Sequence, residues 1–231
     1  MFQIFSSFVI IWNFNTNGYN AYALPYYELM PIFYCKYKND PGTHTCTSME
    51  LDDHKVVSHE IDWNSPYSIH NWVEQMNLID TPKSIIGLIG SAFFLGWVIG
   101  LFFVPRLGDL YGRKYPMIAC MFLQFISLFA LLFNTNIYGA IILLFLNGVS
   151  SSGRASTGFV MMLEYVPREY GVHLSVIFNL AEYFSTVAIT LYFMNVKYWL
   201  PWGIWNACAT FVAMSLLFIL PESPLYYYSN H

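Results

Sequence analysis

The stretch PRLGDLYGRK, residues 105–114, separates two long apolar runs and decides the fold of this chain. It holds three cations and one acid, whereas the flanking runs Ser84–Val104 and Met117–Phe133 carry no charged side chain. Each run is close to the ~20 residues that a helix rising ~1.5 Å per residue needs to cross a bilayer core. Residues 105–114 are therefore predicted to form a tight turn between two membrane helices. The alternative is a surface turn between two buried helices of a soluble protein, and the length of both runs argues against it.

The composition of the whole chain is that of a polytopic membrane protein. Of its 231 residues 56% are hydrophobic and only 10% are charged, whereas soluble domains carry about 25% charged residues. The sequence has no basic cluster of the kind that binds nucleic acid. It also contains no nucleophile–base pattern and no phosphate-binding loop, so we expect neither an enzyme nor a cofactor.

Six apolar segments have the length of membrane helices, which predicts an all-α membrane protein with six spans. The segments are Met1–Leu24, Ser84–Val104, Tyr115–Phe133, Ile137–Leu163, Gly171–Val196 and Leu200–Leu220. Residues 31–83, between the first two spans, are polar and contain eight acids, four lysines and four histidines. We expect residues 1–231 to form one six-helix bundle in the lipid bilayer, with residues 31–83 as a long loop outside it.

The cations of the short loops predict the orientation of the bundle. Six spans place both termini on one side of the membrane, and the short loops on that side carry Arg106, Arg113, Lys114 and Arg168. The short loops on the other side carry only Lys197. Because short cytoplasmic loops are enriched in Lys and Arg, both termini are predicted to be cytoplasmic and residues 31–83 external.

Two cysteines, Cys35 and Cys46, lie in the long polar loop. If the loop faces an oxidising compartment, they can form a disulfide; two unlinked thiols are the alternative. With the neighbouring histidines they match no zinc-ligand spacing, so no metal site is predicted. External cysteines favour the plasma membrane or another membrane of the secretory route.

The charged stretch also carries a family resemblance. Residues 107–114 resemble the signature G-x-x-x-D-R-x-G-R-K of the major facilitator superfamily, although Pro105 replaces its first glycine and Leu110 its first basic residue. Gly90–Trp97 and Pro221–Pro224 are similar to the organic-cation and sugar-porter branch. The resemblance implies the N-terminal six-helix half of a 12-helix transporter, which works by alternating access with a second six-helix half.

The resemblance further implies a gating motif on the cytoplasmic face. Its residues in this chain are Asp109, Gly112, Arg113, Lys114, Glu164 and Glu222. Arg113 is expected to pair with Glu164 or Glu222, and Asp109 to face the second half. Downstream, Gly171 and Leu225 stand where the family has arginines.

Polar side chains recur at helical spacing in three of the spans. Asn13, Asn17 and Asn20 are predicted to share one face of the first helix, and that face should meet other helices or water. Arg154 and Glu182 each lie about 15 Å from the cytoplasmic boundary by residue count, on consecutive antiparallel helices. An ion pair between them is therefore available, and an unpaired charge there would cost at least ~2.5–3.5 kcal/mol.

Two interpretations of these polar residues remain open. In the functional one, Asn13, Asn17, Asn20, Arg154, Asn179 and Glu182 line a substrate pathway. In the structural one, Arg154 and Glu182 lock two helices together. The preferred function is a transporter of a small polar or charged organic solute, and the alternative is a non-transporting six-helix membrane protein with a role in assembly.

Overall fold

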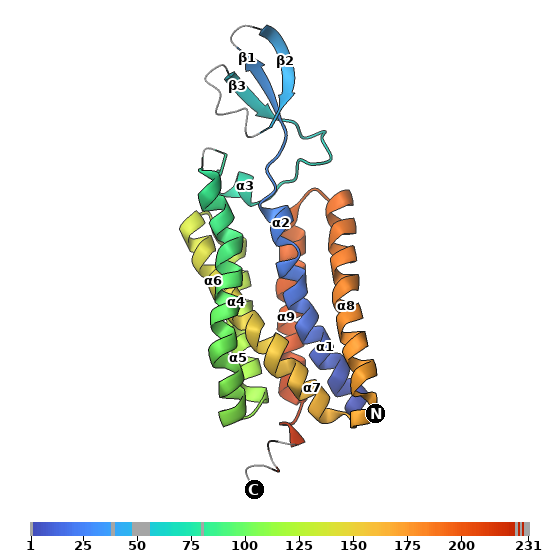
Figure 1. The fold of residues 1–231 in the computed structure, drawn as a ribbon. Helices are drawn as coiled ribbons and strands as arrows, with labels where there is room; N and C mark the ends of the chain where they lie inside the picture. The colour runs from blue at the N-terminus through green and yellow to red at the C-terminus, as the bar shows by residue number, and fades with distance from the viewer. Residues whose placement is uncertain are drawn as a thin grey trace.

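The computed structural model describes residues 2–37, 40–47, 56–79 and 81–224, together with Tyr226 and Tyr228. Its long helices lie side by side with a small β-sheet at one end of the bundle (Figure 1). The start of the first helix and the end of the last lie at the opposite end (Figure 1). We call these the sheet end and the terminal end.

Six helical units correspond to the six predicted spans. In chain order they are α1 (Phe2–Ala21) with α2 (Leu24–Tyr27), α4 (Lys83–Tyr111), α5 (Lys114–Phe133), α6 (Ile137–Gly153) with the π-helical η1 (Arg154–Gly158) and α7 (Phe159–Tyr165), α8 (Arg168–Asn195), and α9 (Trp199–Ile219). Within the described residues, α4, α5, α8 and α9 are each long and apolar enough to cross a membrane. The first unit is rich in amides, and the fourth is divided by η1.

The helix α4 extends through most of the stretch that was predicted to be a turn. It includes Pro105 and ends at Tyr111, so only Gly112 and Arg113 separate it from α5. Proline lacks the N–H of one helical hydrogen bond, but membrane helices tolerate it. Gly112 has φ +94°, a conformation that favours glycine. The prediction of a turn over residues 105–114 was therefore wrong for its first seven residues.

The fourth span is not the single straight helix expected from residues 137–163. The π-helical segment η1 interrupts it at Arg154, and α7 then crosses the front of the bundle towards the terminal end of α8 (Figure 1). A π segment accommodates an extra residue in a helical turn, and such segments are frequent at functional sites.

Glycines allow α4 and α6 to lie in backbone contact. A Cβ at Gly96 would lie 2.1 Å from the carbonyl oxygen of Phe145, and one at Gly148 would lie 2.0 Å from that of Phe93. Neither position accepts a side chain unless the helices separate. Through this reciprocal contact α4 and α6 pack tightly against each other.

The polar segment after α2 is more ordered than a plain loop. It forms the antiparallel strands β1 (Phe33–Tyr37), β2 (Asp40–Cys46) and β3 (Val56–Ile61) in the order β2-β1-β3, followed by the short helix α3 (Trp72–Gln75). A disulfide joins Cys35 on β1 to Cys46 on β2, with Cα atoms 5.9 Å apart. Trp72 of α3 packs on Tyr27 and Trp199, which anchors this segment to the sheet end of the bundle.

Candidate functional site

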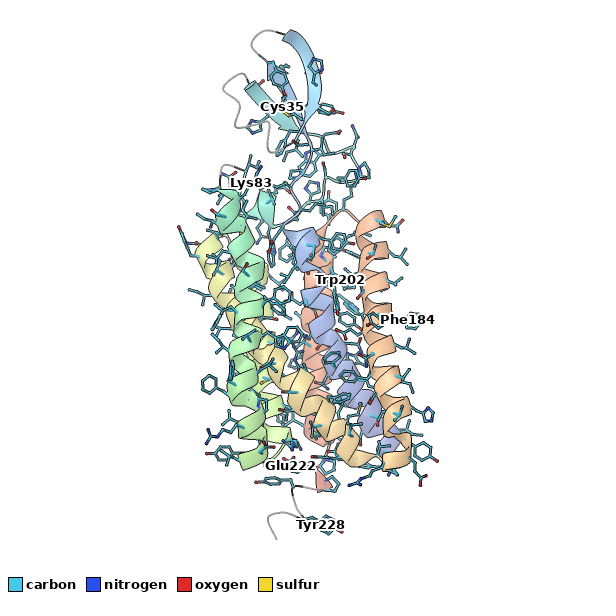
Figure 2. All side chains as sticks on the ribbon, viewed as in Figure 1. Cys35, Lys83, Phe184, Trp202, Glu222 and Tyr228 are labelled. Atoms are coloured by element: carbon cyan, nitrogen blue, oxygen red, sulfur yellow. A yellow bond between two sulfur atoms is a disulfide. The ribbon has the colours of Figure 1, made fainter. Side chains whose placement is uncertain are left out.

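The terminal end contains a network centred on Glu222 (Figure 2). Its carboxylate accepts hydrogen bonds from the backbone N–H groups of Arg113 at 2.8 Å and Lys114 at 3.0 Å. These N–H groups belong to the start of α5, where a helix has unpaired donors and a partial positive charge. A Cβ at Gly112 would lie 2.6 Å from Glu222 Oε2, so the glycine also makes room for the carboxylate.

Side chains extend this network to α7 and α9. Arg113 pairs with Asp109, and its second guanidinium nitrogen lies 3.5 Å from Glu164 Oε1. Ser223 donates a hydrogen bond to the other oxygen of Glu164. Lys114 Nζ donates to the carbonyl of Phe218 at 3.0 Å. The six residues of the predicted gating motif are thus gathered at one end of the bundle, and Glu222 binds Arg113 through the backbone rather than the guanidinium.

A second group of polar residues forms a buried layer midway along the bundle, around Arg154. Arg154 is only 1% exposed. Its guanidinium donates to Thr16 Oγ1 at 3.0 Å and to the carbonyl of Asn13 at 3.3 Å, both on α1. Within the described part of the chain no carboxylate pairs with Arg154. The charge is therefore held by dipoles of α1, at the start of the π segment.

Amide and hydroxyl groups of three helices complete this buried layer. Asn20 Nδ2 donates to Asn147 Oδ1 at 3.2 Å, and Asn147 Nδ2 donates to Ser127 Oγ at 3.2 Å. Ser151 donates to Asn17 Oδ1 at 2.5 Å. Asn17 and Asn20 therefore contact α6. The side chain of Asn13, in contrast, donates to the carbonyl of Ala213 on α9 at 3.2 Å.

The layer also includes polar residues of α5 and α9 that were not predicted to line the pathway. Gln124 of α5 is fully buried and donates to the carbonyl of Thr16 at 3.1 Å. Asn206 and Thr210 of α9 are buried with side-chain polar atoms that have no hydrogen-bond partner among the described residues. In the sequence Gln124 lies three positions before Ser127, and Asn206 lies four positions before Thr210, so helical spacing was a signal that could have identified these residues.

A third group lies on the opposite, open side of α1, along α8. Glu182 is partly exposed, and its Oε1 accepts a hydrogen bond of 2.6 Å from the hydroxyl of Tyr22. Nearer the sheet end, four residues after Tyr22 and eight after Glu182, the hydroxyl oxygens of Tyr26 and Thr190 lie 3.2 Å apart. Asn179 is exposed, and its side chain donates to the carbonyl of Ser175 on its own helix. Between Val176 and Met194 the other exposed residues of α8 are apolar or aromatic, and Phe184 is one of them (Figure 2).

The ion pair between Arg154 and Glu182 is not formed. Both residues contact α1, but Arg154 reaches Asn13 and Thr16 whereas Glu182 reaches Tyr22. The helix α1 lies between the two side chains, because α8 packs on α1 and has little contact with α7. The number of residues to the cytoplasmic boundary predicted similar depths for the two charges in the membrane. It carries no information on which helix lies between them.

Comparisons with known proteins agree with this architecture. The model of the Major Facilitator Superfamily matches residues 7–228. The β-alanine transporter of Drosophila melanogaster is 24% identical over 91% of this chain and 36% of its own length. Solute carrier family 22 member 2 of Rattus norvegicus is 24% identical over 73% of this chain and 30% of its own. The low-affinity glucose transporter HXT3 of Saccharomyces cerevisiae is 28% identical over 61% of this chain and 26% of its own.

A solved structure shows the same fold. The crystal structure of a D-xylose-proton symporter superposes with a TM-score of 0.65 at 12% identity, over 98% of this chain and 50% of the symporter. The predicted six-helix membrane fold, corresponding to half of a transporter, is thereby confirmed. The chain spans well under half the length of the three curated relatives given above. Because the family model covers residues 7–228, this chain belongs to the Major Facilitator Superfamily, a family of membrane transporters and not of enzymes.

Proposed function

We propose that residues 1–231 form the N-terminal six-helix half of a transporter that moves a small polar or charged organic solute across the lipid bilayer. Together with a second six-helix half, in the same or another chain, it would alternate between states open to either side. The mechanism needs no covalent step and no cofactor. Family membership and the match to half of a symporter support this proposal.

The observation that carries the proposal is the position of Glu182. It lies at the middle of the 28-residue helix α8, yet its side chain is partly exposed and, among the described residues, its carboxylate accepts a hydrogen bond from the hydroxyl of Tyr22 alone. A carboxylate at mid-bilayer facing lipid is costly, so this face needs a protein or water covering. A second six-helix half would cover this face with protein, and a hydrated path between the two halves would supply the water.

The three groups of polar residues receive different roles in this proposal. Glu182 and Asn179 line the solute pathway, because they are the predicted pathway residues on the open face. Arg154, Asn13, Asn17 and Asn20 are buried, and their hydrogen bonds join α1 to α6, η1 and α9. We therefore assign to these four residues the positioning of α1, which forms the floor of the pathway.

The terminal-end network would act as the gating motif. Through Glu222, Glu164 and Arg113 it ties the ends of α5, α7 and α9 into one unit. The side chain of Asp109 is 65% exposed, so it can still contact a second half. Such a contact would bias the equilibrium between open and closed states, for which a few kcal/mol suffices.

We further propose that the terminal end is cytoplasmic and that the sheet end faces outside or a secretory lumen. The Cys35–Cys46 disulfide supports this orientation, because disulfides persist in oxidising compartments. The cations Arg113 and Lys114 lie at the other end, as cytoplasmic loops prefer. Both features favour the plasma membrane or a membrane of the secretory route.

Uptake into liposomes tests the proposed function. The longest native chain that contains residues 1–231 is reconstituted, and uptake of β-alanine, glucose and a small quaternary ammonium ion is measured. The first two are the solutes in the names of relatives. For the solute that is taken up, we expect Glu182→Gln to reduce uptake at least about tenfold, the effect of losing ~1.4 kcal/mol.

Glu169→Gln is the matched control, because Glu169 is an exposed acid in the first turn of the same helix. It should leave uptake unchanged. Equal uptake by Glu182→Gln and the unsubstituted protein would remove Glu182 from the pathway. Absence of uptake of every solute, with the second half present, would favour the assembly role instead.

A further inference from the structure

Glu28 is an acid at the sheet end that belongs to none of the three groups described above. It directly follows α2, where its backbone N–H donates to the carbonyl of Leu24 at 3.1 Å. Its carboxylate packs against the backbone of α4 at Gly90. A Cβ at Gly90 would lie 3.4 Å from Oε1 and 3.7 Å from Oε2. A large side chain at residue 90 would therefore take the space that the carboxylate occupies.

One oxygen of the Glu28 carboxylate, Oε1, has no compensating group in the part of the chain that the structure describes. This oxygen is buried and accepts no hydrogen bond. The helix that it packs against has no ionisable side chain between Lys83, at its start, and Arg106 near the opposite end. In the ionised state this oxygen would thus be desolvated without a donor or a cation.

The hydrogen bonds that other elements near α2 make do not involve Glu28, and the buried indole N–H of Trp72 on α3 has no hydrogen-bond partner among the described residues. Asn71 Nδ2 donates to the carbonyls of Tyr26 and Leu29, at 2.9 and 2.7 Å. His70, the nearest titratable residue along that segment, lies 2.7 Å from the carboxylate of Glu74. From α8, Thr190 contacts the hydroxyl of Tyr26. None of these contacts reaches Glu28.

Burial raises the pKa of Glu28 to about 7. An acid with an ordinary pKa of ~4.3 is fully ionised at neutral pH. Glu28 instead changes its charge there, because burial penalises the ionised form. It is neutral below this pH and carries a negative charge above it.

The chemistry of the site selects a proton over a metal ion. A calcium ion takes six to eight oxygen ligands, and a magnesium ion requires an octahedron. The described residues contain no group of three or more His, Cys, Asp or Glu side chains that could hold a metal. A proton needs only one carboxylate, which it converts to a neutral carboxylic acid.

We propose that Glu28 is a proton-binding site, filled from the compartment at the sheet end, whose protonation seats the end of α2 against Gly90 of α4. The neutral acid needs no counter-charge and rests on the bare helix backbone. The ionised carboxylate is stabilised by hydration, so it moves into water. This movement separates the end of α2 from α4. Only the consequence for solute uptake rests on the transport function proposed above.

Infrared difference spectroscopy of the reconstituted protein tests the proton site without any solute. The C=O band of a protonated carboxylic acid should titrate with a midpoint near the pKa of about 7. The band should be absent in Glu28→Gln. In Gly90→Leu the carboxylate is displaced towards water, and the midpoint should fall towards the ordinary ~4.3.

Gly87→Leu is the matched control, because it lies one turn away on the same helix with nothing within 4 Å of its added Cβ. It should leave the midpoint in place, and circular dichroism should show equal helix content in all variants. A titrating band that persists in Glu28→Gln would overturn the proposal. An unchanged midpoint in Gly90→Leu would also overturn the proposal. This second variant allows the test even if Glu28→Gln does not fold.

The two proposals can fail separately. A band that titrates with Glu28 in a protein that takes up no solute would keep the proton site and reject transport. Uptake by a protein in which no band depends on Glu28 would do the reverse. If both hold, uptake should change across pH 7 in the unsubstituted protein, and Glu28→Gln should hold it at the acid level.

Discussion

Arg154 and Glu182 are two charges at similar predicted depth, and they lie in opposite environments. Arg154 is enclosed by α1, α5 and α6, and carbonyl and hydroxyl oxygens hold its charge. Glu182 lies on the open side of α1 and contacts one tyrosine hydroxyl. Hydrogen bonds within the bundle offset the cost of burying Arg154, whereas Glu182 remains partly exposed on the surface of the bundle. The enclosed side therefore supports the fold, and the open side is the place to seek function.

Disrupting the backbone contact between α4 and α6, on the enclosed side, should have the largest effect on stability. Gly148→Leu would place a Cβ 2.0 Å from the carbonyl oxygen of Phe93 and push α6 from α4. We expect the free energy of unfolding, measured by detergent titration of helix content, to fall by about 3 kcal/mol, the upper end for overpacking.

Gly87→Leu again provides the comparison, since its side chain would enter open space on the same helix pair. Its free energy of unfolding should equal that of the unsubstituted protein to within ~0.5 kcal/mol. Equal unfolding of Gly148→Leu and Gly87→Leu would contradict the backbone contact between α4 and α6.

The amides on the two sides should differ by a smaller amount. Asn147→Leu removes the partner of Asn20 and Ser127 in the buried layer. Because orphaned buried groups cost about 1–3 kcal/mol and hydrogen bonds in membranes at most about 1.7, we expect a loss of about 1–2 kcal/mol. Asn179→Leu makes the same chemical change on the exposed surface of α8, where a loss below ~0.5 kcal/mol is expected. Comparable losses in the same unfolding assay would mean that Asn179 is also buried.

The sequence predicted the features that depend on one segment at a time. Apolar length located the six spans, and the signature in residues 107–114 identified the family. The spacing of Asn17 and Asn20 correctly indicated a face that meets another helix. Each of these signals is local, because it depends on helix period or on a motif and not on how the helices are rotated against each other.

The features that sequence reasoning missed depend on relations between segments. Arg113 was expected to pair with Glu164 or Glu222, and its guanidinium lies 3.5 Å from Glu164; the contact of Glu222 with backbone N–H groups, which every sequence has, was not predicted. The π segment at Arg154 redirects α7, and helical periodicity gives no sign of it. Glu28 lies one residue beyond α2 and outside the predicted span Met1–Leu24, and its carboxylate packs against Gly90, 62 positions later in the chain.

The smallest expected effect is the coupling between Arg154 and Glu182, and it is the sharpest test of the comparison. Arg154→Met loses hydrogen bonds to α1 but also removes a desolvated charge, so the two contributions offset each other in part. Glu182→Gln keeps an acceptor for Tyr22 and should change stability little.

The loss in the free energy of unfolding of the double variant should equal the sum of the losses of the two single variants to within ~0.3–0.5 kcal/mol. Residues without a shared partner contribute independently to stability. An ion pair would instead give a coupling between ~0.5 and 3 kcal/mol in the same unfolding titrations. Coupling of that size would mean that α1 does not separate the two charges, and the division into an enclosed and an open side would then have to be abandoned.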